Sequence, residues 1–226
     1  MNTMTSTAET LASEIQHRRD VTSNQPGVLA DIYREEANIT IWQRKLSDSL
    51  AKATNHIFKT KPTLQLSTVV TPENAFTIIH SELGSSEETA SLSEDITQLV
   101  DMFCCLFELK STGLRLTSLS RAMCPRFHVD HVPCRLVTTY HGVGTQWLPH
   151  QIVDRSKLGA GNQGKPDECS GLFDNSDDMQ QLTLGDVALL KGERWQGNDG
   201  AGLVHRSPKL ENGGRRLLLT LDFAND

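Results

Sequence analysis

The sequence has no apolar run that approaches the roughly 18 to 20 residues that a bilayer-spanning helix requires. Its N-terminus lacks the basic start and the continuous apolar segment of a secretion signal. These absences predict a soluble, cytoplasmic protein without a membrane partner. No basic run exceeds a pair and the formal net charge is -6, so the concentrated positive surface of duplex-binding proteins is also missing. Nucleic acid is therefore disfavoured as a partner.

The five cysteines form no C-x-x-C pair, and their number is odd. In a cytoplasmic chain this pattern argues against a disulfide framework. Cys104 and Cys105 lie in the apolar run VDMFCCLFELK, where cysteine behaves as a small buried hydrophobe. Cys124 lies four residues before His128 and is a weak candidate metal ligand.

The 226 residues suffice for one domain with a sizeable core. We interpret residues 1–26 as a flexible N-terminal arm and residues 27–226 as a single domain. Residues 27–113 would form helices and edge strands that support the core, including an apolar helix in SEDITQLVDMFCCLFELKST. Residues 114–226 contain short β-type segments between glycine and proline turns, which favour a sandwich or barrel, a jelly roll being one solution.

Single segments give more detailed expectations. Ser47 is predicted to cap a helix formed by SDSLAKATNHIFK. Residues 154–178 are glycine-rich and polar, which predicts a long loop at the mouth of a pocket, where it could act as a lid that selects the substrate. The segments expected to be strands are NITIWQRK, TLQLSTVVT, LRLTSL, FHVDHVP, CRLVTTYHG, TQWL, DVALLKG, GLVHRS and RRLLLTLDF.

The stretch FHVDH places two histidines and one aspartate within five residues. On an extended chain His128 and Asp130 would share one face, with Val129 on the other. Polar residues on a solvated strand would show the same pattern, so a metal site needs a third ligand. The best candidate is His205 in GLVHRSP. Two histidines and one carboxylate leave further metal positions open, an arrangement suited to non-haem iron(II) chemistry.

Four blocks, in this order, resemble the iron(II)- and 2-oxoglutarate-dependent oxygenases: FHVDH, RLVTTYHGVGTQWL, LTLGDVALLKG, and GLVHRSP with GGRRLLLTLDF. The resemblance covers residues 114–223. It implies an α+β fold with a double-stranded β-helix core (a cupin-like jelly roll) on which the N-terminal helices pack. It also implies iron(II) held by His128, Asp130 and His205, with zinc possible in its place, and 2-oxoglutarate as cosubstrate. No catalytic residue is implied beyond the metal ligands.

In that family a late arginine binds the distal carboxylate of 2-oxoglutarate, a task suited to a planar fork of donors. Arg215 and Arg216 compete for this role. Strand alternation places Arg215 on an apolar face and Arg216 on the other, so Arg216 is preferred. The family often has Ser or Thr two residues later, where this chain has Leu218. Tyr140 or Thr220 could supply the missing hydrogen bond.

Several other residues are expected to surround the site without binding the metal. His131, His141 and His150 fall in turns or on the opposite strand face and are more typical of surface residues. The candidates for supporting positions near the metal are Arg126, Thr145, Trp147 and Arg215.

Over nearly its whole length the chain also resembles the bacterial domain-of-unknown-function family 1826. That resemblance implies a link to zinc-associated GTPases and a role connected with metal supply. The leading hypothesis is an oxygenase that acts on an unknown small-molecule or protein substrate. The alternatives are a non-enzymatic metal-binding or metal-homeostasis module on the same barrel and a zinc hydrolase that activates water. An oxygenase requires Arg216 to point into the pocket, and the alternatives do not.

Overall fold

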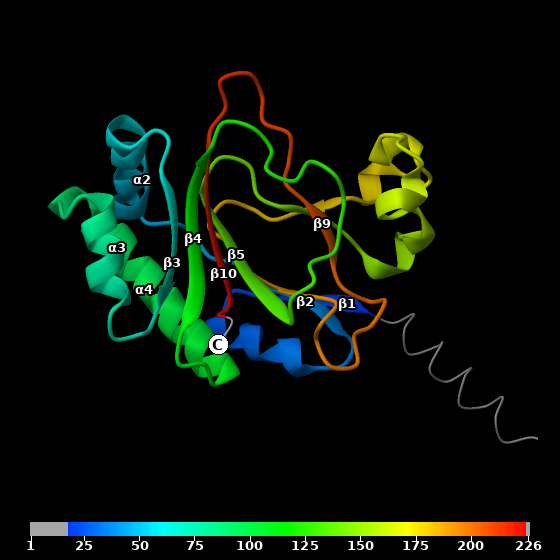
Figure 1. Ribbon diagram of the computed structural model, residues 1–226, viewed down its shortest axis with the longest axis horizontal. Helices are drawn as coiled ribbons and strands as arrows, with labels where there is room; N and C mark the ends of the chain where they lie inside the picture. Colours follow the sequence, from blue (N-terminus) through cyan, green and yellow to red (C-terminus); the bar gives the residue numbers. More distant parts are fainter. Residues whose placement is uncertain (1–17, 225–226) are drawn as a thin grey trace, which may run out of the picture.

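A computed structural model describes residues 18–224, in which strands form two sheets and helices cover one of them (Figure 1). The larger sheet has the strand order β1-β2-β8-β5-β10-β4-β3, and the smaller has the order β7-β6-β9. Only β1 and β2 are parallel neighbours in these sheets; the other pairs are antiparallel. The strands are β1 (Arg19–Ser23), β2 (Ala37–Trp42), β3 (Gln65–Val70), β4 (Thr112–Leu119), β5 (Cys134–His141), β6 (Gln146–Leu148), β7 (Gln180–Gln181), β8 (Val187–Lys191), β9 (Val204–Arg206) and β10 (Arg216–Phe223).

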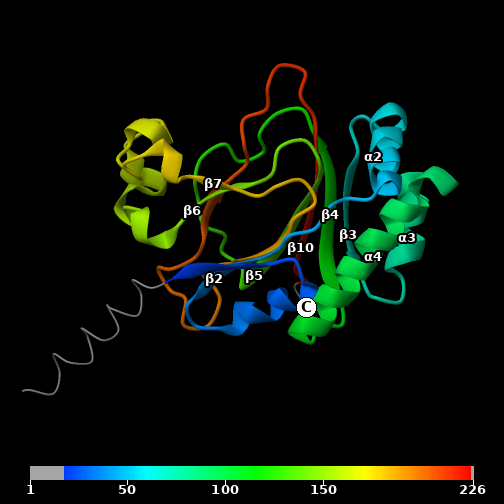
Figure 2. The same ribbon diagram turned by 180° about the vertical axis from the view of Figure 1, so that it is seen from behind.

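Three α-helices of the described chain lie together beside β3 and β4 (Figures 1 and 2). As predicted, Ser47 caps the first of them, because its hydroxyl accepts a hydrogen bond of 3.3 Å from the Leu50 amide. The α-helices are α2 (Asp48–Thr60), α3 (Ala75–Leu83) and α4 (Glu87–Phe107). Short 3-10 helices cover Pro26–Tyr33, His150–Ile152, Arg155–Lys157, Gly159–Asn162, Asp167–Cys169 and Ser176–Asp178.

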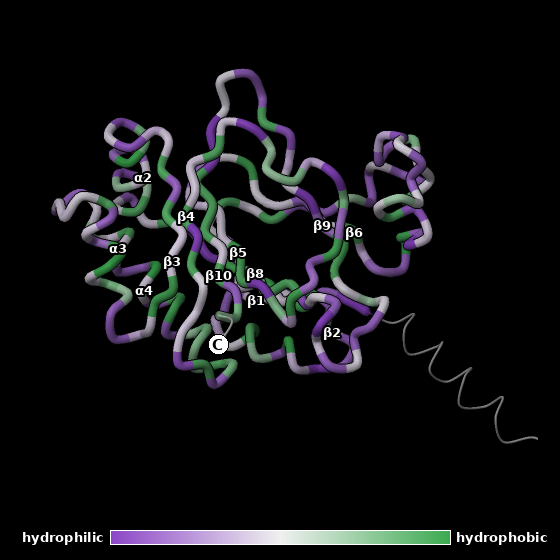
Figure 3. Tube along the Cα trace, viewed as in Figure 1, coloured by the Kyte–Doolittle hydropathy of each residue, from purple (hydrophilic) through white to green (hydrophobic). Residues whose placement is uncertain are grey.

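The main core lies between these helices and one face of the larger sheet. Leu92 and Ile96 of α4 are fully buried in one cluster with Leu116 of β4 and Leu219 of β10. The hydrophobic residues that supply this core appear green along the strands and helices in Figure 3. The apolar helix predicted within residues 93–112 therefore packs on the sheet, as expected, although it begins earlier, at Glu87.

The α+β class predicted from the sequence is confirmed, and two local expectations are wrong. Residues 19–23, expected in a flexible arm, form β1, which pairs with β2 at the edge of the larger sheet. The segment FHVDHVP was expected to be a strand, but only His128 pairs, in an isolated bridge with His205. The rest of the predicted arm, residues 1–17, lies outside the described residues.

Within residues 18–224, no helix has the length and apolar character needed to cross a bilayer.

Candidate metal centre

The first and third predicted ligands are held side by side by backbone pairing. The His128 amide donates to the His205 carbonyl and the His205 amide to the His128 carbonyl, each at 3.0 Å. His205 belongs to β9, which is paired with Trp147 of β6, so the smaller sheet fixes its position. The two imidazole centroids are consequently 4.6 Å apart, although 77 residues separate the two histidines along the chain.

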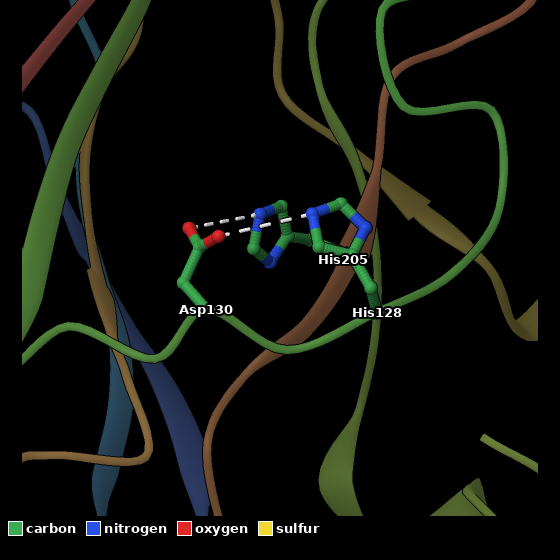
Figure 4. Close-up of side chains that lie close together, drawn as sticks. All are labelled: His128, Asp130 and His205. Carbon is green, nitrogen blue, oxygen red and sulfur yellow. Dashed lines mark ion pairs between the residues drawn. The ribbon is translucent and has the colours of Figure 1, made fainter. Parts of the chain in front are cut away.

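The hydrogen bonds of the two imidazoles define which nitrogen faces the centre. Nδ1 of His128 lies 2.9 Å from the Arg126 carbonyl, and Nδ1 of His205 lies 3.1 Å from the Leu203 carbonyl. A carbonyl only accepts, so each Nδ1 carries the proton and each Nε2 presents a lone pair. Both Nε2 atoms face the Asp130 carboxylate, at 3.8 Å for His128 and 3.3 Å for His205 (Figure 4).

One ligand atom from each of His128, Asp130 and His205 lies within 4.8 Å of the other two. The three residues predicted from the sequence are therefore together, and the cluster is partly to fully buried. Two neutral imidazole nitrogens and one carboxylate oxygen are a donor set that suits iron(II) or zinc. Cys124 lines the adjoining pocket but is not a member of this cluster.

The protonation states also favour cation binding. Burial, with a smaller effect of the nearby His205, lowers the pKa of His128 and keeps its ring neutral at neutral pH. Burial alone would raise the pKa of Asp130. The contact with His205 and the positive charge of Arg135 outweigh burial, so the pKa of Asp130 lies well below its usual range. Asp130 is therefore ionised and ready to act as a ligand.

Arg135, which the sequence did not single out, holds Asp130 in place. Its Nη1 lies 2.7 Å from Oδ2 of Asp130, and its Nε lies 2.7 Å from Oδ1 of Asp222 on the neighbouring strand β10. The side chains of Arg135 and Asp222 are only 18% and 11% exposed. Charge-assisted hydrogen bonds at two carboxylates fix the guanidinium, and it in turn fixes the carboxylate of the cluster.

Arg216 lines the same pocket as His128 and His205, on the pocket face of β10. It is 1% exposed, yet its guanidinium bonds only hydroxyl groups: Nη2 lies 2.7 Å from Thr145 Oγ1 and 3.1 Å from Thr139 Oγ1. Its Nε is buried and has no hydrogen-bond partner among the described residues. Burial lowers the pKa of Arg216 to about 10, which still leaves it charged at neutral pH. A buried cation without a carboxylate is a place for an anionic ligand.

The other predicted residues take different positions. Thr145 and Thr220 line the pocket. Trp147 is buried in a hydrophobic cluster with residues of the larger sheet and does not line this pocket. Arg126 contacts His128 through its backbone carbonyl, while its side chain is directed to the loop that contains Asp167. Arg215 is exposed and lies over the ring of Phe58, away from the pocket.

The expectation that Tyr140 faces the cosubstrate is wrong. Tyr140 is 1% exposed and lies in the core between the larger sheet and the helices. Its hydroxyl donates to Oδ2 of Asp95 at 2.6 Å, and the same carboxylate accepts from Arg44. Alternation along β5 explains the orientation, since Val137 is on the pocket face and Tyr140 is an odd number of residues further on.

Replacing Tyr140 by Phe should therefore lower the free energy of unfolding by about 1.5 kcal/mol, because one hydrogen bond to a charged group is lost. The affinity for 2-oxoglutarate should not change. Chemical denaturation and cosubstrate titration of the same preparation measure the two quantities. Weaker cosubstrate binding with unchanged stability would show that this residue has been placed on the wrong side of the sheet.

Asp167, also missed by the sequence reasoning, attaches the long loop to the metal cluster. Its carboxylate is buried and accepts a hydrogen bond of 2.9 Å from the Phe127 amide, next to His128. Arg126 and Arg206 each approach it to 3.3 Å. Residues 154–178 were expected at the pocket mouth, but none of them lines the pocket that contains the histidines. The loop contributes to a neighbouring cavity instead.

The sequence as a whole was then compared with known families. A family model described as "Protein of unknown function (DUF1826)" matches residues 23–222, which is most of the chain. The chain belongs to the DUF1826 family. A search of the curated proteins gives no match to this DUF1826 protein.

Solved structures give a comparison at the level of the fold. The dioxygenase for auxin oxidation from rice matches the DUF1826 chain with a TM-score of 0.50 and 8% identity, over 91% of this chain and 82% of that one. A Pseudomonas putida prolyl-4-hydroxylase has a TM-score of 0.47 and 11% identity, with 88% and 98% covered. Full-length Neurospora crassa T7H, in complex with alpha-KG, has a TM-score of 0.45 and 14% identity, with 99% and 80% covered. At such identities the likeness to the rice enzyme is one of fold alone.

Proposed function

We propose that this protein is a non-haem iron(II), 2-oxoglutarate-dependent oxygenase of the hydroxylase type. One observation carries the proposal: the two histidines of the His128–Asp130–His205 cluster line the same pocket as a buried arginine that lacks a carboxylate partner among residues 18–224. A metal-binding module has no use for the arginine. An oxygenase of this class uses both, because its cosubstrate carries one carboxylate toward the metal and one away from it.

The donor set fits the metal. Nε2 of His128, Nε2 of His205 and the carboxylate of Asp130 would hold iron(II), and zinc could take its place. The carbonyls that accept from the two Nδ1 atoms keep both rings in the ligating tautomer and orientation. Arg135 keeps Asp130 ionised and directed toward the histidines.

The surroundings of Arg216 fit the cosubstrate. Its unpaired Nε and its location in a pocket next to the cluster suit the distal carboxylate of 2-oxoglutarate. The hydroxyls of Thr139 and Thr145 hold the guanidinium in one orientation without neutralising it. Thr220 lies four residues beyond Arg216 on β10, about 14 Å along the strand, so it does not replace the Ser or Thr that the family has at the position of Leu218.

Iron and 2-oxoglutarate, when bound, supply the oxidation of a substrate C–H bond by oxygen. The chain's own contribution is to orient the ligands, to hold a cation for the cosubstrate and to enclose the site with apolar side chains such as Val137 and Leu218. We infer that the two sheets around this pocket form a double-stranded β-helix, with residues 27–226 as one domain. The fold shared with the rice dioxygenase supports this inference.

The proposal is tested by metal analysis of anaerobically purified protein, followed by titration with 2-oxoglutarate. The expected result is bound iron, a visible charge-transfer band as the cosubstrate chelates it, and slow succinate release without added substrate. If the protein keeps its metal but gives neither cosubstrate binding nor succinate, the oxygenase proposal fails. A module connected with metal supply, and with zinc-associated GTPases, would then take its place.

A further inference from the structure

We propose that Arg115 binds an oxyanion, either a carboxylate or a phosphate, on the primary substrate, so that the enzyme acts on an anionic molecule. This inference deepens the proposed function and rests on it, because that function assigns 2-oxoglutarate to Arg216. Arg115 belongs to β4 and lines the same pocket as His128 and His205. Its side chain is exposed, so a ligand can reach it.

The arginines that line the pocket differ in whether they have a carboxylate partner, and Arg115 has none in the described chain. Four arginines line it, and no Asp or Glu from residues 18–224 does, although acidic residues outnumber basic ones by 28 to 22 in the whole chain. Arg135 is paired with two aspartates, and Arg206 with an aspartate and a glutamate. Arg216 and Arg115 therefore remain without a carboxylate in the described chain. Low-dielectric walls around unpaired charges of one sign concentrate ligands of the opposite sign.

Arg115 and Arg216 occupy separate positions on the face of the larger sheet that lines the pocket. In the register of β4 and β10, Arg115 is opposite Thr220, and Arg216 is opposite Leu119. Four residues separate the two positions along either strand, which is about 14 Å at about 3.4 Å per residue. A cosubstrate with one carboxylate on Arg216 directs the other to the metal, so neither charge is left for Arg115. A second anion is needed to pair it.

The side chains next to Arg115 define the rest of the ligand. Thr117 and Thr220 offer hydroxyls on the same face, while Val137 and Leu218 present apolar surface. Met123 lines the pocket and is 51% exposed, which places it at the opening. A substrate with an apolar body and one oxyanion head would be held by the head at Arg115, with its body toward the metal cluster.

The test uses full-length protein loaded with zinc, which prevents turnover, and saturated with 2-oxoglutarate. Acetate and inorganic phosphate are the probes, added separately to distinguish a carboxylate from a phosphate site. Nuclear magnetic resonance follows the arginine Nε–H signals, and Arg115→Gln identifies the signal of Arg115. The matched control is Arg194→Gln, since Arg194 is exposed, lines none of the cavities described above and has no ion pair within the described residues.

We expect the Arg115 signal to shift with one of the probes, and the affinity for that probe to fall about tenfold in Arg115→Gln and to stay unchanged in Arg194→Gln. The affinity for 2-oxoglutarate should be the same in both variants. Loss of 2-oxoglutarate binding in Arg115→Gln, or no response to either probe, would overturn the inference. If the wild type binds no 2-oxoglutarate but Arg115 still responds, the proposed function fails and Arg115 remains an anion site.

Discussion

Replacement of Asp130 by Ala is expected to abolish tight metal binding and leave the chain folded. The substitution removes the one carboxylate of the cluster in the described chain and leaves two neutral imidazoles. Loss of a partner that merely supports a metal ligand costs ten- to a hundredfold in affinity, so loss of the ligand should cost at least about a hundredfold. Arg135 keeps its two contacts with Asp222, which should preserve the strand pairing around it. Metal content after dialysis and a competitive metal titration measure the effect.

The matched control is His131→Ala. His131 directly follows the cluster in sequence but is exposed and is not one of its members. Its replacement should change metal affinity little, which separates ligand loss from general disturbance of the turn. Equal loss of metal in both variants would mean that the ligands lie on the other side of this segment.

Replacement of Arg216 by Leu should weaken 2-oxoglutarate binding strongly while the metal stays. All three ligand residues are unchanged, and the buried guanidinium that faces the pocket is lost. Hydrogen bonds to charged groups contribute roughly 1.5 to 3 kcal/mol, so affinity for the cosubstrate should fall about ten- to a hundredfold. The variant should still fold, because an unpaired buried charge is exchanged for an apolar side chain. Iron content, cosubstrate affinity and substrate-independent succinate release are measured together.

Arg215→Leu is the control for this result. Arg215 precedes Arg216 in the chain, but it is exposed and lies 5.6 Å from the centroid of the Phe58 ring. Cosubstrate affinity should remain near the wild-type value. If both arginine variants lose 2-oxoglutarate equally, or if neither does, the cosubstrate is not held by the pocket face of β10.

Strand alternation predicted the orientation of Arg216 well, because β10 has a strongly apolar partner face. Leu217, Leu219 and Leu221 pack toward the helices, so the intervening positions face the pocket. On β5 alternation points the same way, since Arg135 and His141 share the face of Val137 while Leu136 and Tyr140 share the other, but the tyrosine hydroxyl was given more weight than the alternation. Tyr140 was consequently placed on the pocket side. A period of two shows which residues share a face, but the buried face must be known from another source.

The sequence predicted that His128, Asp130 and His205 lie together, yet it did not predict the conformation around them. His128 and Asp130 were expected to share the face of a strand, whereas only His128 is paired and the chain then turns. The ligands converge because backbone hydrogen bonds join His128 to His205, a contact between distant segments. Local pattern can suggest residue types for a site, but it contains no information on such long-range pairing.

Arg135 and Asp167 could not be found for the same reason. Arg135 is oriented by its hydrogen bond to Asp222, which is 87 residues away in the chain and on the neighbouring strand. Asp167 lies in a polar segment whose composition predicts only a loop, and it is buried by contacts with residues about 40 positions away. Charged residues of this kind become recognisable when the fold brings their partners to them.

The contacts of Asp167 restrict how a ligand can reach the His128–Asp130–His205 cluster. Swinging residues 154–178 aside would leave the Phe127 amide and two arginines without their acceptor, at a cost of roughly 1.5 to 3 kcal/mol for each charged hydrogen bond. It would also loosen the backbone that carries His128. Passage near Met123, which is exposed and lines the same pocket as His128, would break none of these bonds. A ligand that enters by that route would leave the backbone around His128 undisturbed.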